Sequence, residues 1–171
     1  MANLINVNGV QLFGAPDNAT VYPEYNYNTE QRLPRAAAVY SFGGELLMRI
    51  QPDKNGRMTQ ELFFNIYKIS FNEWNHLHWA RQKSIKQDYK VMVNQITKAK
   101  RIQGTYEVEY HFKFINNPLD AVNCFIMVKI LEDLLFVHDE YNKITSMTIN
   151  SNYSDTNKDY VKIVIKEVER K

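Results

Sequence analysis

Cysteine is almost absent from this chain of 171 residues, and the long hydrophobic runs of membrane proteins are absent altogether. The single cysteine, Cys124, excludes an intramolecular disulfide framework and fits a reducing compartment. One cysteine and four histidines cannot supply the paired ligands of a structural zinc site. No stretch is long enough for a membrane span, and the N-terminus lacks the basic start and apolar run of a signal peptide. We therefore expect a soluble, cytoplasmic protein with no membrane partner.

An excess of one charge is also lacking, because 21 basic and 19 acidic residues leave a net charge of +2. Apolar residues make up 44% of the chain, and its eleven tyrosines and nine phenylalanines are typical of half-buried strands. The length is sufficient for one domain with a complete hydrophobic core. The distribution of the charges is therefore more informative than their sum.

The first 58 residues differ in composition from the rest. The stretch "GAPDNATVYPEYNYNTEQRLPR" is rich in Pro, Asn and Tyr and has no sustained periodicity. The following "AAAVYSFGGELLMRI" is compatible with a strand or a hairpin around Gly43 and Gly44, and "QPDKNGR" predicts a turn. We interpret residues 1–58 as an N-terminal extension of unknown role that packs on the main domain or on a partner.

Residues 59–171 carry clearer secondary-structure signals. In "FNEWNHLHWARQKSIKQDYKVMVNQITKAKR" a helical stripe contains Ile85, Tyr89, Met92 and Ile96, and Gly104 ends the helix. The segment "TYEVEYHFKFI" alternates as a half-buried strand does. The predicted order is strand, helix, strand, helix, strand and strand, with the last two strands in "KITSMTIN" and "YVKIVIKEV". This order predicts an α+β domain with a mixed sheet of about four strands and two main helices.

The first predicted helix is strongly basic. From His78 to Arg101 it holds seven basic residues and only Asp88 as an acid (7 − 1 = +6). Such a helix can be a plain solvated surface, or it can bind an acidic protein or the phosphates of a nucleic acid, with Trp79 against the backbone or an unstacked base. The candidate DNA-binding residues are His78, Trp79, Arg81, Lys83, Lys86, Lys90, Lys98, Lys100 and Arg101.

The second predicted helix is acidic. The segment from Asn116 to Glu140 contains five acidic residues and one basic residue, Lys129, which gives a net charge of −4 (1 − 5 = −4). Because Mg²⁺ prefers hard oxygen ligands, Asp120, Asn123, Asp139 and Glu140 are candidate metal ligands. The alternative is structural. Asp120 then caps the helix, Glu132 and Asp133 are solvated, and the pair at 139 and 140 forms a turn.

The stretch "NEWNHLHWARQKSIKQDYKVMV" followed by "LDAVNCFIMVKILEDLLFVHDEYNKI" resembles the RusA-like Holliday junction resolvases. The resemblance covers roughly residues 61–168, in order and at similar spacing. It implies a RusA-like nuclease domain over residues 59–171 and a homodimer. In this chain "LDAVN" replaces the family's Asp-x-Asp-Asn motif, so that one Asp remains and the Asn is displaced.

The resemblance also implies a reaction and a site. RusA-like enzymes nick two opposing strands of a four-way DNA junction, and carboxylates from paired subunits bind Mg²⁺, for which Mn²⁺ is a plausible substitute. The implied catalytic residues are Asp120, Asn123, Lys129, Asp139 and Glu140. A helical wheel turns Lys129 about 180° from Asp120, so a shared site requires a helix that starts after Asp120.

The expected function is therefore a Mg²⁺-dependent endodeoxyribonuclease that resolves branched DNA in recombination and repair. A non-catalytic DNA- or RNA-binding protein on the same fold is the first alternative, because the second Asp of the motif is missing. A protein–protein adaptor with a basic and an acidic face is the second alternative. Since such resolvases commonly belong to phages and prophages, we expect a viral source.

Overall fold

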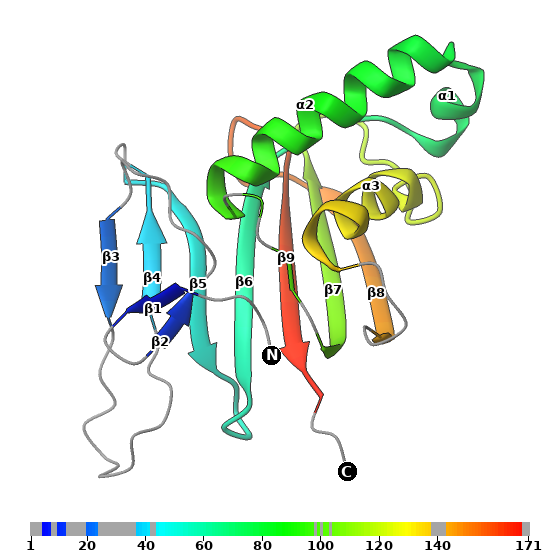
Figure 1. The fold of residues 1–171 in the computed structure, drawn as a ribbon. Helices are drawn as coiled ribbons and strands as arrows, with labels where there is room; N and C mark the ends of the chain where they lie inside the picture. Colours follow the sequence, from blue (N-terminus) through cyan, green and yellow to red (C-terminus); the bar gives the residue numbers. More distant parts are fainter. Residues whose placement is uncertain are drawn as a thin grey trace, which may run out of the picture.

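The computed structural model describes residues 5–7, 10–12, 20–23, 37–41, 44–97, 99, 101–102, 104–137 and 143–168 (Figure 1). Within these ranges the chain forms nine strands and three helices. In chain order they are β1 (Ile5–Val7), β2 (Val10–Leu12), β3 (Thr20–Pro23), β4 (Ala37–Tyr40), β5 (Leu46–Pro52), β6 (Met58–Asn65), α1 (Phe71–His76), α2 (Trp79–Thr97), β7 (Thr105–Phe114), α3 (Phe125–Leu135), β8 (Lys143–Tyr153) and β9 (Tyr160–Glu167).

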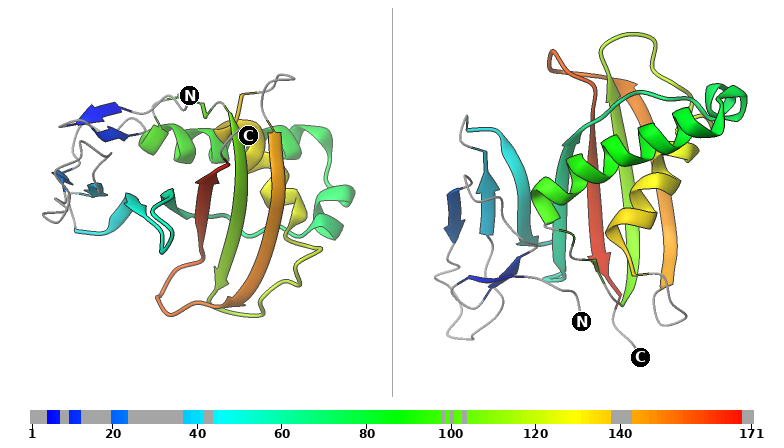
Figure 2. Two further views of the ribbon diagram at one scale, coloured as in Figure 1. Left: turned by 90° about the horizontal axis from the view of Figure 1, so that it is seen from below. Right: turned by 45° about the horizontal axis from the view of Figure 1, so that its top comes forward.

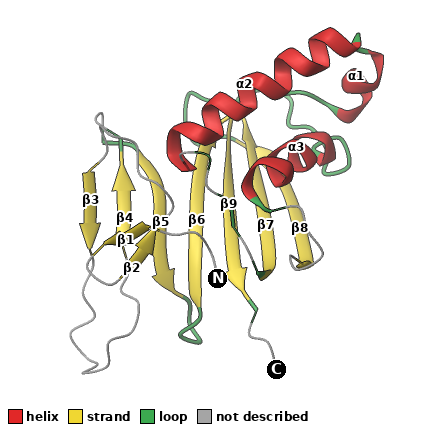
Figure 3. Ribbon diagram, in the orientation of Figure 1, coloured by secondary structure: helices red, strands yellow, loops and turns green. Residues whose placement is uncertain are grey.

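Seven of the strands form one sheet in the order β3-β4-β5-β6-β9-β7-β8 (Figure 3). Every neighbouring pair is antiparallel except β7 and β8, which run parallel over ten paired residues. Strand β9, the last in the chain, therefore pairs between β6 and β7 in the middle of the sheet. The remaining strands, β1 and β2, pair with each other as a separate two-stranded sheet.

The three helices cover one face of the sheet (Figure 2). Strand β7 alternates strictly between half-buried and buried residues, so that every second side chain enters a single core beneath the helices. The helix α3 is apolar on most sides and contributes many of its residues to that core. Large side chains that are fully buried there include Leu62, Phe64, Tyr89, Tyr110, Phe112, Phe114 and Met127.

Helix α2 packs through a narrower stripe than α3. Ile85, Tyr89 and Ile96 are buried as the sequence periodicity predicts, but the fourth core residue is Val93 and not Met92. Met92 is only half-buried and lies at the edge of the helix–sheet contact. A 3.6-residue period makes positions 92 and 93 nearly equivalent for a stripe centred on Tyr89, and only the packing of the helix against its neighbours decides between them.

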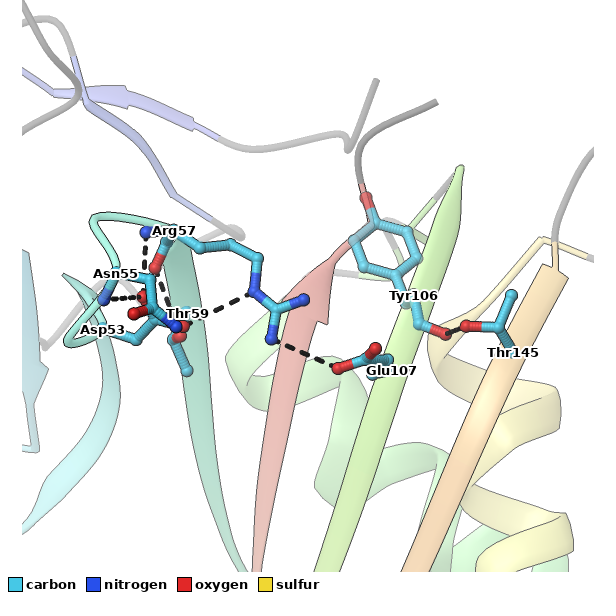
Figure 4. Close-up of polar contacts among 7 residues, drawn as sticks. All are labelled: Asp53, Asn55, Arg57, Thr59, Tyr106, Glu107 and Thr145. Atoms are coloured by element: carbon cyan, nitrogen blue, oxygen red, sulfur yellow. Dashed lines mark hydrogen bonds and ion pairs between the residues drawn. The ribbon is translucent and has the colours of Figure 1, made fainter. Parts of the chain in front are cut away.

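No described element covers the opposite face of the sheet, which carries charged side chains in ion pairs. Glu61 on β6 is only 8% exposed and lies between the Arg49 guanidinium at 2.6 Å and the Lys162 ammonium at 3.2 Å. Arg57, just before β6, reaches across β9 to Glu107 on β7 at 3.2 Å and also contacts Asp53 (Figure 4). These contacts link four strands through their polar face.

The predicted α+β class and the order of elements from β6 to β9 are confirmed. For residues 59–171 the prediction of about four strands and two main helices agrees with β6 to β9 and with α2 and α3, to which the six-residue α1 is added. The sheet as a whole has seven strands, because β3, β4 and β5 of residues 1–58 extend it. The strand or hairpin expected around Gly43 and Gly44 corresponds to the antiparallel pair β4 and β5, and the turn expected in "QPDKNGR" joins β5 to β6. The first predicted helix is divided at Leu77, whose extended backbone ends α1.

Candidate functional site

The first acidic motif forms a closed turn before α3. The Asn123 backbone N–H donates to Asp120 Oδ1 at 2.8 Å, and the Asn123 side-chain amide donates to Asp120 Oδ2 at 3.3 Å. The helix begins only at Phe125, and its N-cap residue Cys124 makes no side-chain cap. Asp120 is therefore not the cap of α3 and instead orders the turn that precedes it. A helix start after Asp120, which a shared site with Lys129 requires, is confirmed.

A lysine that the sequence analysis missed holds the loop before this turn. The Lys68 ammonium donates to the carbonyl oxygens of Asn116 at 2.8 Å and Asn117 at 2.6 Å, and it lies 5.1 Å from the centre of the Phe114 ring. Asn117 has a positive φ of 44°, which asparagine tolerates better than most residues. No local pattern reveals Lys68, because 48 residues of sequence separate it from the loop that it holds.

The Cys124 thiol is buried beside the acidic turn, and its pKa depends on the charges around it. Burial raises the pKa of the thiol to about 11, the neighbouring Ser151 side chain opposes that rise, and the charges of Asp120 and Lys68 act in opposite directions. Both charged side chains therefore lie near enough to influence the same buried thiol. At neutral pH the thiol is protonated and behaves as a core residue, as the sequence predicts.

The short helix α1 connects this turn to α2. Its first N–H groups, on Phe71 and Asn72, donate to the Asn123 carbonyl at 3.0 Å and to the Asn123 side-chain oxygen at 3.4 Å. At the other end of α1, the Gln82 side chain donates to the Trp74 carbonyl at 2.8 Å. Asn123 thus fixes one end of α1 and α2 fixes the other, so that the acidic turn and the start of α2 are structurally coupled.

The start of α2 and the segment before α1 form what we call the basic aromatic surface. It consists of Tyr67, His78, Trp79, Arg81, Lys83, Lys86 and Lys90, all exposed. Trp79 is 68% exposed, and its ring lies 5.4 Å from that of His78. Arg81 lies over the Tyr67 ring and Lys86 over the Trp74 ring, each at 5.7 Å, which favours rigid presentation of these cations.

Six of the nine candidate DNA-binding residues thus lie between His78, just before α2, and Lys90 in the middle of that helix. Arg101 is exposed but follows the C-terminal end of the helix. Lys98 and Lys100 lie outside the described residues. Tyr67 was not predicted for this surface, because it precedes α1 and comes near only through the fold.

The second acidic pair is not placed by the structure. Asp139 and Glu140 lie outside the described residues, so their contact with Asp120 stays a prediction. The described residues on either side, Val137 and Lys143, lie at the end of α3 opposite to Asp120 (Figure 1).

Two predictions for α3 itself can be compared with the structure. Lys129 is exposed on this helix, one turn beyond Phe125. Of the two acids expected to be solvated, Asp133 is exposed and Glu132 is half-buried.

The donor atoms at the acidic turn suit Mg²⁺ in kind but are few. Asp120 is exposed and offers carboxylate oxygens with free lone pairs, and Asn123 offers an amide oxygen already engaged with α1. Mg²⁺ is commonly held by one or two carboxylates together with water and phosphate oxygens. Among the described residues no three His, Cys, Asp or Glu side chains gather into a metal-binding group. Asp120 can therefore serve as one ligand of a site that needs a further carboxylate.

No model of a known protein family matches the chain, and neither does any curated protein or solved structure. Within the described residues, no helix combines the length and apolarity that crossing a membrane requires.

Proposed function

We propose that this protein is a metal-dependent, structure-specific endodeoxyribonuclease that cleaves branched DNA. The observation that carries this proposal is the coupling of the acidic turn to the basic aromatic surface through α1. Cations that bind phosphates and a carboxylate that can bind Mg²⁺ thereby lie at the two ends of one short helix. A polyanionic substrate with a scissile phosphodiester suits both features.

The roles of the residues follow from their placement. Lys83, Lys86 and Lys90 would contact phosphates without reading the bases, and Trp79 would stack on a base exposed at the branch point. Asp120 would hold the metal, with its carboxylate oriented by Asn123. Mg²⁺ at this position would activate water for attack on the phosphodiester and stabilise the developing charge. Lys129 would approach the phosphate as a cation only if the DNA lies along the exposed side of α3.

We propose that a complete metal site contains residues from two copies of the chain. Helix α3 has 11 residues and is about 16 Å long. Asp120 precedes this helix in the sequence and Asp139 follows it, so the two carboxylates come from opposite sides of α3 in the chain. We therefore propose that Asp139 and Glu140 of a second copy complete the site at Asp120, in a homodimer with two equivalent sites.

A non-catalytic DNA-binding protein is the competing function. The single carboxylate of "LDAVN" is the specific observation in its favour, since Asp120 and Asn123 alone supply only one charged ligand. Such a protein would use the basic aromatic surface in the same way and would bind junctions without cutting them.

The first experiment measures cleavage of a labelled synthetic four-way junction in Mg²⁺, in Mn²⁺ and in EDTA. Paired nicks that disappear with EDTA and with Asp120→Asn support the nuclease. The control Asp88→Asn should cleave at least as well as the wild type, because it removes the only acid from the basic helix. Tight binding of the junction without cleavage in either metal would establish the competing function.

A mixing experiment tests the shared site. Asp120→Asn and Asp139→Asn should each be inactive alone. When the two are co-refolded, mixed dimers contain one site with neither substitution, and nicking of one strand should return. If each site belongs to a single chain, every site in the mixture carries one substitution, and the mixture stays inactive.

A further inference from the structure

A cleft of about 1000 Å³ lies at the other end of α2, where strand β5 separates from β6. The two strands pair only from Met48 opposite Leu62 to the Pro52–Met58 pair. Residues 63–65 at the end of β6 still pair with β9, but in the described part no strand pairs with them on the β5 side. The last turns of α2 and the loop before β9 line the gap that results.

The described lining combines apolar and polar residues. The apolar residues are Leu46, Leu47, Phe63, Phe64, Met92 and Ile96. Uncharged amides predominate among the polar residues, and they are Asn65, Asn94, Gln95 and Asn157. A mostly apolar cleft with a few convergent polar groups has the composition and size of a small-molecule site.

The four amide side chains of the cleft make no hydrogen bond to another described residue, although Asn94 is half-buried. Each presents both donors and an acceptor, and a half-buried amide gains most from a ligand that pairs with both. The edges of nucleobases offer adjacent donors and acceptors, and Asn or Gln pairs with the adenine edge through two hydrogen bonds.

Two aromatic rings lie beside one of these amides, Asn65. Tyr160 on β9 is the direct cross-strand partner of Asn65 on β6, and Phe63 lies two residues from Asn65 on the same face of the sheet. The Tyr160 hydroxyl is fixed by a 2.7 Å hydrogen bond to Asp155. An aromatic ring next to an unpaired amide suits a flat heteroaromatic group, which stacks on the ring and pairs along its edge.

A cation lies at the rim of the cleft. The Lys158 ammonium contacts the Glu45 carboxylate at 3.0 Å, and the two side chains are 46% and 58% exposed. An exposed ion pair of this kind contributes little stability, so Lys158 can exchange Glu45 for another anion at small cost. A phosphate attached to a base in the cleft would be such an anion.

We infer that this cleft binds a nucleotide whose base lies among the amides and whose phosphate reaches Lys158. An adenine nucleotide is the preferred ligand. Carbohydrate sites also combine amides with aromatic rings. Among the described lining residues the only carboxylate, Glu45, is paired with Lys158, whereas a rim cation favours a phosphorylated ligand. The inference does not depend on nuclease activity, because the basic aromatic surface and the acidic turn share no residue with the cleft.

The test is an NMR titration of the ¹⁵N-labelled chain with 2′-deoxyadenosine 5′-monophosphate, followed through the side-chain amide signals. The signals of Asn94 and Gln95 should shift and saturate. Gln95→Leu should weaken binding about tenfold, whereas Gln87→Leu should leave it unchanged, since Gln87 is exposed two turns earlier on the same helix and outside the cleft. Unchanged backbone spectra of both variants would show that they fold.

A second titration separates the base from the phosphate. Lys158→Met should weaken binding of the monophosphate but leave binding of 2′-deoxyadenosine unchanged. No shift of the cleft signals at millimolar nucleotide would overturn the inference. A response to glucose or maltose without a response to the nucleotide would overturn it as well and would assign the cleft to a sugar.

Discussion

The two faces of the sheet differ in how they contribute to stability. On the face beneath the helices, alternate residues of β6, β7 and β9 enter one apolar core in which Tyr110 and Phe112 are fully buried. On the opposite face the same strands carry ion pairs, and among those of the described residues only the Glu61 cluster is withdrawn from water. Burial of apolar area stabilises the fold in proportion to that area, whereas an ion pair must first offset the loss of hydration. The comparison teaches that neighbouring residues of one strand contribute by different mechanisms.

The largest expected effect lies on the covered face. Phe112→Ala should lower the free energy of unfolding by about 3–5 kcal/mol, because it removes a fully buried ring and leaves a cavity. The matched control Lys113→Ala, on the next residue of β7 and on the open face, should change it by no more than about 0.5 kcal/mol. Urea denaturation measures both. Equal losses for the two variants would contradict the division into two faces.

The second prediction concerns the buried charge on the open face. Glu61→Gln should cost about 2 kcal/mol, since it leaves Arg49 and Lys162 facing each other without the carboxylate between them. Glu109→Gln serves as the control, because Glu109 is more exposed and its partner His111 is 3.6 Å away. That control should cost less than about 0.5 kcal/mol. A similar loss of unfolding free energy for both substitutions would mean that the burial of Glu61 does not increase the contribution of its ion pairs to stability.

The third prediction concerns the coupling through α1. Asn123→Ala removes the side-chain hydrogen bonds to Asp120 and to the N–H of Asn72. The expected loss is about 1 kcal/mol, concentrated in faster hydrogen exchange of the α1 amides. Asn75→Ala, an exposed residue of α1, should leave the exchange rates of its neighbours almost unchanged. If hydrogen exchange in the Asn123 variant became equally faster in α1 and α3, a local role of Asn123 at α1 would be contradicted.

The smallest effect on stability is expected from ionisation of the Cys124 thiol. Burial raises its thiol pKa from the ordinary 9.0 to about 11, so the native protein should react with iodoacetamide far more slowly than the unfolded chain at pH 9. Because the pKa is raised, the linked stability is fully present below pH 9 and is lost as the pH rises through about 11. The reaction is specific to one site, since the chain has no other cysteine. Alkylation at the rate of the unfolded chain would show that the thiol is accessible.

The candidate site was predictable in part. The spacing of Asp120 and Asn123 indicated that the two would face the same way, and the structure joins them by direct hydrogen bonds. The basic residues of α2 were readable from charge alone. Lys68 and Tyr67 were not, because their partners come from segments far away in the sequence. The stripe predicted from the sequence missed Val93 for the same reason, since neighbouring positions on one helix are separated only by what packs against them. Met92 itself is half-buried and packs against the core.

The sequence by itself determined the local features of this protein, namely the α+β order, the alternation of β7, the basic start of α2 and the paired carboxylate and amide of the acidic turn. Each of these depends on residues close together in the chain, and periodicity and charge record such features directly. The tertiary structure decided the position of β9 inside the sheet, the addition of β3, β4 and β5, the coupling through α1 and the cleft beside β6. These depend on contacts between distant segments, whose energies come from burial and geometry that no short stretch of sequence contains.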